Sequence, residues 1–331
     1  MKVNSAELLF IKSVKDGIPN RDPLADSDAR RIFGEEDGRI SLSDVSIKRD
    51  VRDFVQMAYP DGSDQKNLFI FVREERDEKS GNLLGRGSLA KKLIERSGVT
   101  SGSEKDQLIQ SAFDVRAFGV VFSVSKKNFK VTGPVQFGWA HSLHPVESRY
   151  IQGTVVMPSE DIKESKESSG KKEGQNSEDN SGKSQGTIWT SFIVPFAVFV
   201  MPGIINANIA KDSGLKESDV ELLLEGLWRG TQMRQARGRG MQQPLFMMHV
   251  EYLDPLYRIG YLEDYVRLMP EAIEWRNGKQ PSSIHEIQLD VSELSKVLDQ
   301  NRSRIRRVRI WSEPHLTVIG ASDLMDQQPL W

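Results

Sequence analysis

The residues best suited to chemistry form an arginine- and glycine-rich segment, residues 234–241, which reads RQARGRGM. Guanidinium groups pair with phosphate oxygens through parallel hydrogen bonds, and small neighbouring residues let the backbone approach a phosphate closely. The surrounding window, Gly226–Val250, contains four arginines and no acidic residue. This pattern predicts a surface that binds phosphate groups.

Two other windows are basic and lack acidic residues: Val115–Val146, and Arg302–Ile310 with its five arginines. Aromatic residues interleave with the first of these windows: Phe118, Phe122, Phe129, Phe137 and Trp139. Single-stranded nucleic acid combines bases that stack on aromatic rings with phosphates that need cations. If the fold brings the three windows together, they predict one positive groove for such a ligand. The alternative is that each window is a solvated face with acids nearby in space, and that Phe118 and Phe122 are core residues.

Enzymatic and metal sites have no comparable support in the sequence. The chain has no cysteine, which excludes a thiolate nucleophile and cysteine-ligated zinc, and it lacks the phosphate-loop, GxGxxG and GxSxG motifs. His141 and His144 are the only close histidine pair, and they have too few neighbouring ligands for a metal site. Aspartates cluster in the loop 16–44; magnesium binding is one explanation, and turn formation is the simpler one. We therefore expect no cofactor and no metal.

Length and composition indicate a soluble globular protein of one large domain or two small ones. The 331 residues include 45 Lys and Arg against 47 Asp and Glu, and the net charge of −2 arises entirely within Ser159–Gly186. That stretch contains a single aliphatic residue, so it cannot bury enough apolar surface to order itself, and we predict a flexible insertion. The chain shows no apolar run of membrane-spanning length and no signal-peptide pattern, which indicates a cytoplasmic protein.

The elements that must position the basic residues alternate irregularly along the chain. Ser43–Tyr59 is the clearest predicted helix, because apolar residues recur at helical spacing behind a serine N-cap, and Lys48, Arg49 and Arg52 flank the apolar stripe. Further helices are predicted over Ser88–Arg96, Ser218–Trp228 and Val291–Asp299, and strands over Ala6–Val14, Val115–Val124, Ile188–Met201 and Leu245–Tyr252. Such an order favours an α+β sheet decorated by loops over a doubly wound sheet.

Several segments, taken together, resemble the backbone subunit of type I CRISPR Cascade complexes, the seventh Cas family, in its I-B and I-C branches. They follow one another over about Ala6–Tyr252: NRDP (20–23), SDVSIKRDVRDFV (43–55), DVRAFG (114–119), GPVQFGWAHSLHPV (133–146), VPFAVFVMPGIINANIA (194–210) and LLLEGLWRGTQMRQARGRGM (222–241). The combination of DVRAFG with GPVQ and HSLHPV is the most specific part. The pattern favours the I-B branch over the I-C branch.

The resemblance implies a single hand-shaped RNA-binding domain over residues 1–331. Its α+β core would be a modified RRM-like, ferredoxin-type fold with finger loops, a thumb-like excursion at 133–153 and the flexible insertion at 159–186. Such subunits polymerise along a CRISPR guide RNA and present it for pairing with target DNA. Their other partners are further Cascade subunits, namely the large subunit, the guide-handle-binding subunit and the guide-processing endonuclease. The RNA-binding residues implied by position are Lys48, Arg49, Arg52, Gln136, His141, Ser142, Arg234, Arg237 and Arg239.

Two departures from the family pattern leave alternatives open. The family often carries a His-Asp-Arg-Ser-like run before the arginine- and glycine-rich segment, where this chain has QMRQ (232–235), and the run Arg302–Arg309 matches no family motif. One alternative is a subunit similar to those of type III complexes, which cleaves target RNA through an aspartate of the first long loop, Asp22 or Asp26 here. The other is a protein-only assembly module without an RNA role.

Overall fold

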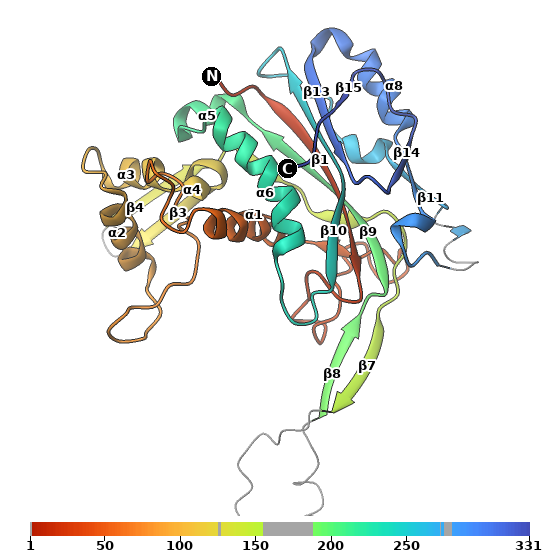
Figure 1. Ribbon diagram of the computed structural model, residues 1–331, viewed down its shortest axis with the longest axis horizontal. Coiled ribbons are helices and arrows are strands. Elements are labelled where there is room, and N and C mark those ends of the chain that lie inside the picture. The colour runs from red at the N-terminus through yellow and green to blue at the C-terminus, as the bar shows by residue number, and fades with distance from the viewer. Residues whose placement is uncertain (1, 125–126, 155–187, 272, 275–279) are drawn as a thin grey trace, which may run out of the picture.

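An eight-stranded sheet crosses the middle of the molecule in the computed structural model, which describes residues 2–124, 127–154, 188–271, 273–274 and 280–331 (Figure 1). The strand order is β15-β13-β10-β1-β9-β6-β2, and β5 also pairs with β9. The strands are β1 Ala6–Lys15, β2 Ser41–Leu42, β5 Val135–Phe137, β6 Ala140–Ser142, β9 Phe196–Ile205, β10 Met241–Tyr252, β13 Ile305–Ser312 and β15 Met325–Gln327. Neighbouring strands are antiparallel, except that β13 and β15 are parallel.

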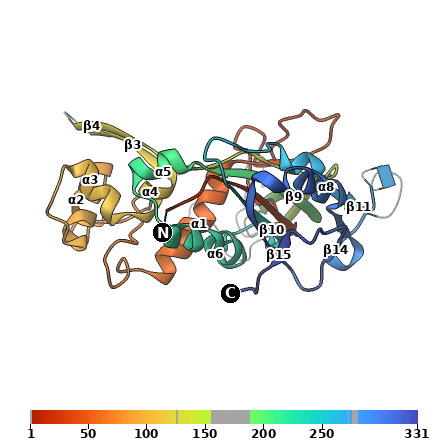
Figure 2. The ribbon, with the colours of Figure 1, turned by 90° about the horizontal axis from the view of Figure 1, so that it is seen from above.

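Strand β1 is buried on both faces of the sheet, which explains the apolar run Leu8–Ile11 within it. Leu8 and Phe10 pack in one core cluster with helices α1 (Asp44–Ala58) and α6 (Glu217–Met233). Leu9 and Ile11 point to the opposite face, because side chains alternate along a strand, and they belong to a second cluster that includes α8 (Ser292–Gln300). The view from above separates α1 and α6 from α8 (Figure 2).

The second face is covered by the C-terminal part of the chain. Besides α8, this part contains a small sheet of β11 (Arg267–Met269), β12 (Gln288–Asp290) and β14 (Thr317–Ile319). Other short elements are α5 (Ala207–Ser213) and the 3-10 helices η1 (Leu262–Tyr265), η2 (Ile284–Glu286) and η3 (Arg302–Arg304). Among the helices that the structure describes, none is long and apolar enough to cross a membrane.

The part of the chain that follows α1 and precedes β5 forms a separate lobe (Figure 1). This lobe has its own apolar core. It contains α2 (Arg86–Ser97), α3 (Glu104–Ser111), α4 (Phe113–Phe118) and the hairpin β3 (Gly119–Val124) with β4 (Lys127–Thr132). The predicted strand over Val115–Val124 is therefore wrong at its beginning. All six residues of α4 are buried, so they show no amphipathic helical period, and Gly119 with φ of +79° ends the helix.

A two-stranded hairpin projects from one end of the central sheet (Figure 1). It is formed by β7 (Arg149–Thr154) and β8 (Ile188–Ile193). The prediction of one strand over Ile188–Met201 is wrong, because β8 leaves the sheet and β9 begins only after Val194-Pro195. Of the expected excursion 133–153, residues 135–142 form β5 and β6 and pair with β9, so the projecting part begins with β7. The predicted insertion 159–186 lies outside the described residues.

The α+β class is confirmed by this arrangement of helices around a mixed sheet. The predicted strands over Ala6–Val14 and Leu245–Tyr252 are confirmed as β1 and β10. The predicted helices are confirmed as α1, α2, α6 and α8, each within a few residues of its expected bounds except for the longer C-terminal end of α6. Where the apolar period was clear, it predicted the element correctly.

Candidate nucleic-acid interface

One buried carboxylate, that of Asp50 on α1, holds both ends of the arginine- and glycine-rich segment. Its Oδ1 accepts hydrogen bonds from Arg234 Nη1 at 2.8 Å and from Arg239 Nη2 at 2.7 Å. Its Oδ2 accepts from Lys12 Nζ at 3.1 Å. Asp50, Lys12 and Arg239 are buried, whereas Arg234 is partly exposed. We call these four residues the Asp50 cluster.

The Asp50 cluster places three cationic side chains around one carboxylate. Burial lowers the pKa of Lys12 to about 8, and the attraction of Asp50 only partly offsets this effect. Burial also lowers the pKa of Arg239. A second carboxylate, that of Asp53, lies 3.6 Å from Arg234 Nε at the edge of the cluster. The excess of positive charge beneath the surface at the end of α6 favours anionic ligands nearby.

Arg237, in the middle of the same segment, is exposed and lies over an aromatic ring. Its guanidinium carbon is 5.5 Å from the ring centroid of Trp189 on β8. Arg21, in the loop after β1, donates from Nη2 to Ser191 Oγ of the same strand at 3.2 Å. We call Arg21, Trp189 and Arg237 the hairpin-base surface. Cations beside an aromatic ring suit a ligand that offers both phosphates and stacking bases.

Close backbone contacts bring together the three segments that form the hairpin-base surface. The amide of Ile18 donates to the carbonyl of Gly238 at 2.9 Å, and the amide of Gly17 donates to the carbonyl of Val194 at 3.1 Å. A Cβ atom on Gly17 would lie only 2.1 Å from the amide nitrogen of Gly240, so a side chain there would push the two segments apart. The loop after β1, the link that follows β8 and the arginine- and glycine-rich segment are thereby fixed together.

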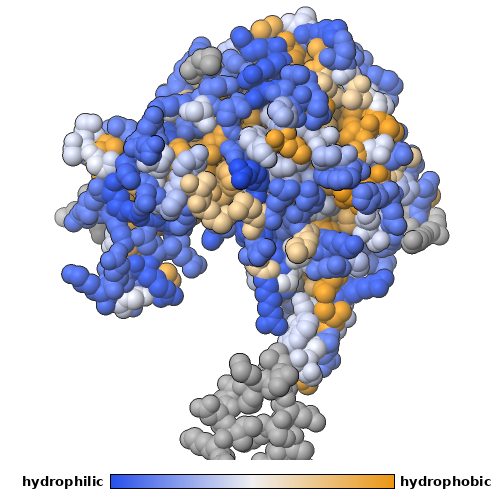
Figure 3. All heavy atoms as spheres, viewed as in Figure 1, coloured by the Kyte–Doolittle hydropathy of each residue, from blue (hydrophilic) through white to orange (hydrophobic). Residues whose placement is uncertain are grey.

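The outer surface near this site is mostly hydrophilic (Figure 3). In that view, hydrophobic side chains gather over the C-terminal elements at the upper right and along one side of the projecting hairpin. On the hairpin, Tyr150 and Ile188 are each 60% exposed. Exposed aromatic and aliphatic side chains beside cations are also common where proteins or bases dock.

The three basic residues predicted on α1 have different surroundings. Arg49 is exposed and pairs with Asp53 at 2.5 Å, one helical turn away. Lys48 pairs in the same way with Asp44 at 2.7 Å and is only slightly exposed. Arg52 is buried, its Nε donates to Asp114 Oδ2 at 2.9 Å, and it lies over Phe118. Arg49 is therefore the member of this set that a ligand reaches most directly.

The predicted residues Gln136, His141 and Ser142 lie in the central sheet, on β5 and β6, and not on the projecting hairpin. Gln136 is exposed and donates from Nε2 to the carbonyl of Gly133. His141 is half-buried against Ser41 Oγ at 2.9 Å, and partial burial together with the charge of Arg39 lowers its pKa. Ser142 is buried, with its hydroxyl bonded inside the fold.

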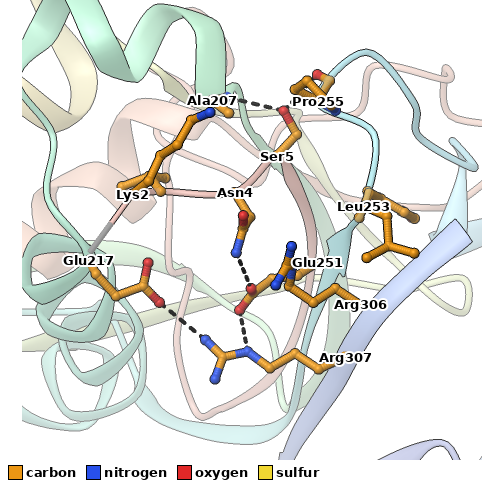
Figure 4. Close-up of a pocket in the computed structure, with 12 residues that line it drawn as sticks. Lys2, Asn4, Ser5, Ala207, Glu217, Glu251, Leu253, Pro255, Arg306 and Arg307 are labelled. Carbon is orange, nitrogen blue, oxygen red and sulfur yellow. Dashed lines mark hydrogen bonds and ion pairs between the residues drawn. The ribbon is translucent and has the colours of Figure 1, made fainter.

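The third basic window lies at the other end of α6. It borders a cleft of about 590 Å³. Arg307 donates there to Glu251 and to Glu217, the first residue of α6 (Figure 4). Arg309 forms a bidentate pair with Glu221, at 2.8 and 2.9 Å. The segment 234–241 follows the last residue of α6, about 25 Å along the helix axis. The prediction of one groove that includes 302–310 is therefore wrong.

The one arginine of the first window is also neutralised within the fold. Arg116 is buried on α4 and forms a bidentate pair with Asp219 of α6, with Nη2 2.8 Å from Oδ1. Phe118 and Phe122 are core residues, as the alternative interpretation predicted. Acids that are distant in the sequence thus neutralise arginines of all three windows.

The candidates for catalysis and metal binding do not converge. Asp22 accepts a hydrogen bond from the amide of Leu24, and Asp26 is exposed in the left-handed region with φ of +47°. His144 is buried and accepts from the amide of Val198 through Nε2 at 3.1 Å, and burial lowers its pKa to about 4. Within the described ranges, no group of three or more histidine and acidic side chains is arranged to hold a metal ion.

Comparison with known proteins decides the family. The family described as "CRISPR-associated protein Cas7" matches residues 4–292, most of the length of the chain. The chain belongs to the Cas7 family. The resemblance to the seventh Cas family that the sequence motifs carry is thereby confirmed, and its I-B branch stays a prediction.

Relatives of this Cas7-family chain align with nearly its whole length. A protein of Haloferax volcanii described as "CRISPR-associated protein Cas7" is 26% identical over 357 aligned positions, which cover 99% of this chain and 93% of the relative. Two solved chains have TM-scores of 0.56 and 0.53, both at 13% identity and over 99% of this chain. Their titles are "CRISPR RNA-guided surveillance complex, pre-nicking" and "CRISPR RNA-guided surveillance complex", and 96% and 95% of their own lengths are covered. At this identity the likeness shows a shared fold.

Four residues of the candidate interface in this Cas7-family chain are missing from the sequence-based set: Lys12, Asp50, Arg21 and Trp189. Asp50 could have been found, because it falls three residues after Ile47 and four before Phe54 on the buried side of α1, where a carboxylate requires a buried cation. Lys12 interrupts an apolar strand and gives the same signal. Arg21 lies within the NRDP motif, but Trp189 gave no signal because its strand was predicted to be central.

Proposed function

We propose that this Cas7-family chain is the guide-RNA-binding backbone subunit of a type I Cascade complex of the I-B branch. Copies of the chain would polymerise along the guide and present it to target DNA, in a particle with the large subunit, the guide-handle-binding subunit and the guide-processing endonuclease. Base pairing would read the sequence, while the protein supplies cations and shape and has no catalytic role. The observation that carries the proposal is the hairpin-base surface, where Arg237 lies over Trp189 beside Arg21.

The topology supports a modified RRM-like core with a thumb. Helix α1 lies between β1 and β5 in the chain, α6 lies between β9 and β10, and the strand order β10-β1-β9-β6 fits a β-α-β-β-α-β unit. RRM domains bind RNA on the sheet face opposite the helices. Here the cluster around Leu9 and Ile11 covers that face. We infer that the guide instead crosses the hairpin base and α1, with β7 and β8 as the thumb.

Exposure divides the predicted RNA-binding residues into two groups. Those that would meet the guide directly are exposed or partly exposed: Arg49, Gln136, Arg234 and Arg237, with Lys48 and His141 at the edge. Those that are buried would act by holding the surface in place: Arg52, Ser142 and Arg239. Arg21 and Trp189 join the first group.

The test is to purify the protein alone and measure its binding to single-stranded RNAs of unrelated sequence over a range of salt concentrations. We expect similar affinity for every sequence, a steep salt dependence and large particles that shrink after RNase treatment. The variant Arg237→Ala should bind every RNA more weakly. A protein that stays monomeric and ignores RNA at low salt would refute autonomous guide binding.

The same preparation tests the type III-like alternative, which no observation in the structure favours. Guide-loaded protein is incubated with complementary RNA and magnesium, and the variant Asp22→Ala serves as the control. We expect intact RNA in both reactions. Cleavage that disappears in the variant would overturn the non-enzymatic proposal.

A further inference from the structure

We propose that Asp50 is a positioning residue for RNA binding: it never meets the RNA, yet it sets where Arg237 lies. This inference rests on the proposed function, because it concerns the same surface. Both arginines that frame the loop 235–238 donate to one oxygen of Asp50, Arg234 at 2.8 Å and Arg239 at 2.7 Å. The loop is therefore held at both ends by one atom of α1, and the residue between these anchors that projects over Trp189 is Arg237.

The anchor at Arg239 also fixes the second cationic segment. While Nη2 of Arg239 donates to Asp50, its Nη1 donates to the carbonyl of Pro19 at 2.8 Å. Pro19 is two residues before Arg21, which is bonded to Ser191 on the hairpin. One planar guanidinium thus ties α1 to the loop after β1, and a lysine has no equivalent fork. Asp50 therefore influences Arg21 and Arg237 together.

The position of Asp50 is itself rigid. Helix α6 approaches α1 so closely that a Cβ atom on Gly230 would lie 2.3 Å from the carbonyl oxygen of Asp50. Lys12 Nζ holds the other carboxylate oxygen from β1 at 3.1 Å. The carboxylate is wholly buried, so solvent and ligands do not reach it. A group that is fixed from three elements and hidden from the surface can act on RNA only through the loop it holds.

The direction in which RNA affinity changes distinguishes a positioning role of Asp50 from a purely electrostatic one. Replacing Asp50 by asparagine removes a negative charge beneath an anion-binding surface, and this alone would strengthen RNA binding. Asparagine also weakens both anchors, because its single oxygen accepts without a charge and its amide nitrogen cannot accept from Lys12. A loosened loop has the opposite effect on affinity, because Arg237 must then be ordered again in the complex. We expect the second effect to dominate, with RNA affinity about tenfold lower for Asp50→Asn, since ordering one long, flexible side chain on binding costs up to about this much affinity.

The matched control is Asp219→Asn, which breaks another buried pair between an aspartate and an arginine, at the far end of α6. Both variants should lower the melting temperature, but only Asp50→Asn should lower RNA affinity, measured by fluorescence anisotropy well below both melting temperatures. Hydrogen exchange should be faster at the amide of Ile18, whose acceptor is Gly238 of the loop, in Asp50→Asn alone. Equal loss of affinity in both variants, or unchanged or tighter binding in Asp50→Asn, would overturn the proposal.

A double-mutant cycle gives the sharpest readout. If Asp50 acts through Arg237, the effect of Arg237→Ala on affinity should shrink in the Asp50→Asn background, whereas independent roles predict additive losses. Should Asp50→Asn not fold, Arg239→Lys keeps the charge but loses the fork, and wild-type affinity in that variant would refute the inference. A wild-type protein without RNA affinity would refute the proposed function itself, whereas weakened Arg237→Ala with unaffected anchor variants would refute only the role of Asp50.

Discussion

Two arginines only two residues apart should lose different properties when each is replaced by alanine. Arg237 is exposed and contacts Trp189, so Arg237→Ala should weaken RNA binding and leave the fold intact. Arg239 is 5% exposed and paired with the wholly buried Asp50, so Arg239→Ala should first of all destabilise the protein. Comparing these two variants therefore distinguishes a residue that contacts RNA from one that supports the fold, within one short segment.

The size of each effect follows from these surroundings. A hydrogen bond to a charged group contributes about 1.5–3 kcal/mol, so Arg237→Ala should bind RNA roughly 10- to 150-fold more weakly at low salt. Losing one phosphate contact flattens the salt slope by about 0.7, so the deficit should shrink about 2.6-fold between roughly 50 and 200 mM salt. Breaking a buried pair costs about 3–5 kcal/mol, so Arg239→Ala should lower the melting temperature by several degrees.

The assay combines fluorescence anisotropy with several unrelated single-stranded RNAs and thermal melting of the same samples. The reasoning is refuted if Arg237→Ala lowers the melting temperature as much as Arg239→Ala, or if it leaves affinity and salt slope unchanged. A loss that is confined to certain RNA sequences would show that Arg237 reads bases, against the role of a scaffold.

Two further predictions concern Trp189 and His144. Trp189→Ala should weaken binding to every RNA by about 1–3 kcal/mol, the range for one stacked base, with little change of the salt slope; a slope change as large as that of Arg237→Ala would contradict a stacking role. For His144, burial lowers the folded pKa to about 4 from the ordinary 6.5, so between these values the unfolded state binds the extra proton and the free energy of unfolding falls as the pH falls. Because a glutamine oxygen can accept from the Val198 amide, His144→Gln should reduce this slope by up to about 1.4 kcal/mol per pH unit in urea titrations, while buried His249 retains its own contribution of the same sign. An unchanged slope would show that His144 is not the group that titrates.

The sequence by itself determined the local elements and the family. The apolar period of α1 and the doubly buried run of β1 predicted both elements, because these patterns depend on residues a few positions apart. The ordered motifs indicated the Cas7 family, and the RQARGRGM segment contributes Arg237 to the hairpin-base surface, whose role in RNA binding stays a prediction. Prediction was wrong where burial hid the period, as in α4, and where a proline divided one apolar run into two strands.

Only the tertiary structure decided which cations are available to a ligand. Arg239 is neutralised by Asp50, 189 positions away, and Arg116 by Asp219, 103 positions away. An acid-free window in the sequence therefore says little about local charge in space. The same is true of Trp189, which leaves the predicted core because β8 turns out of the sheet and meets Arg237. Ion pairs and ring contacts depend on distances through space, and the topology of the sheet fixes those distances.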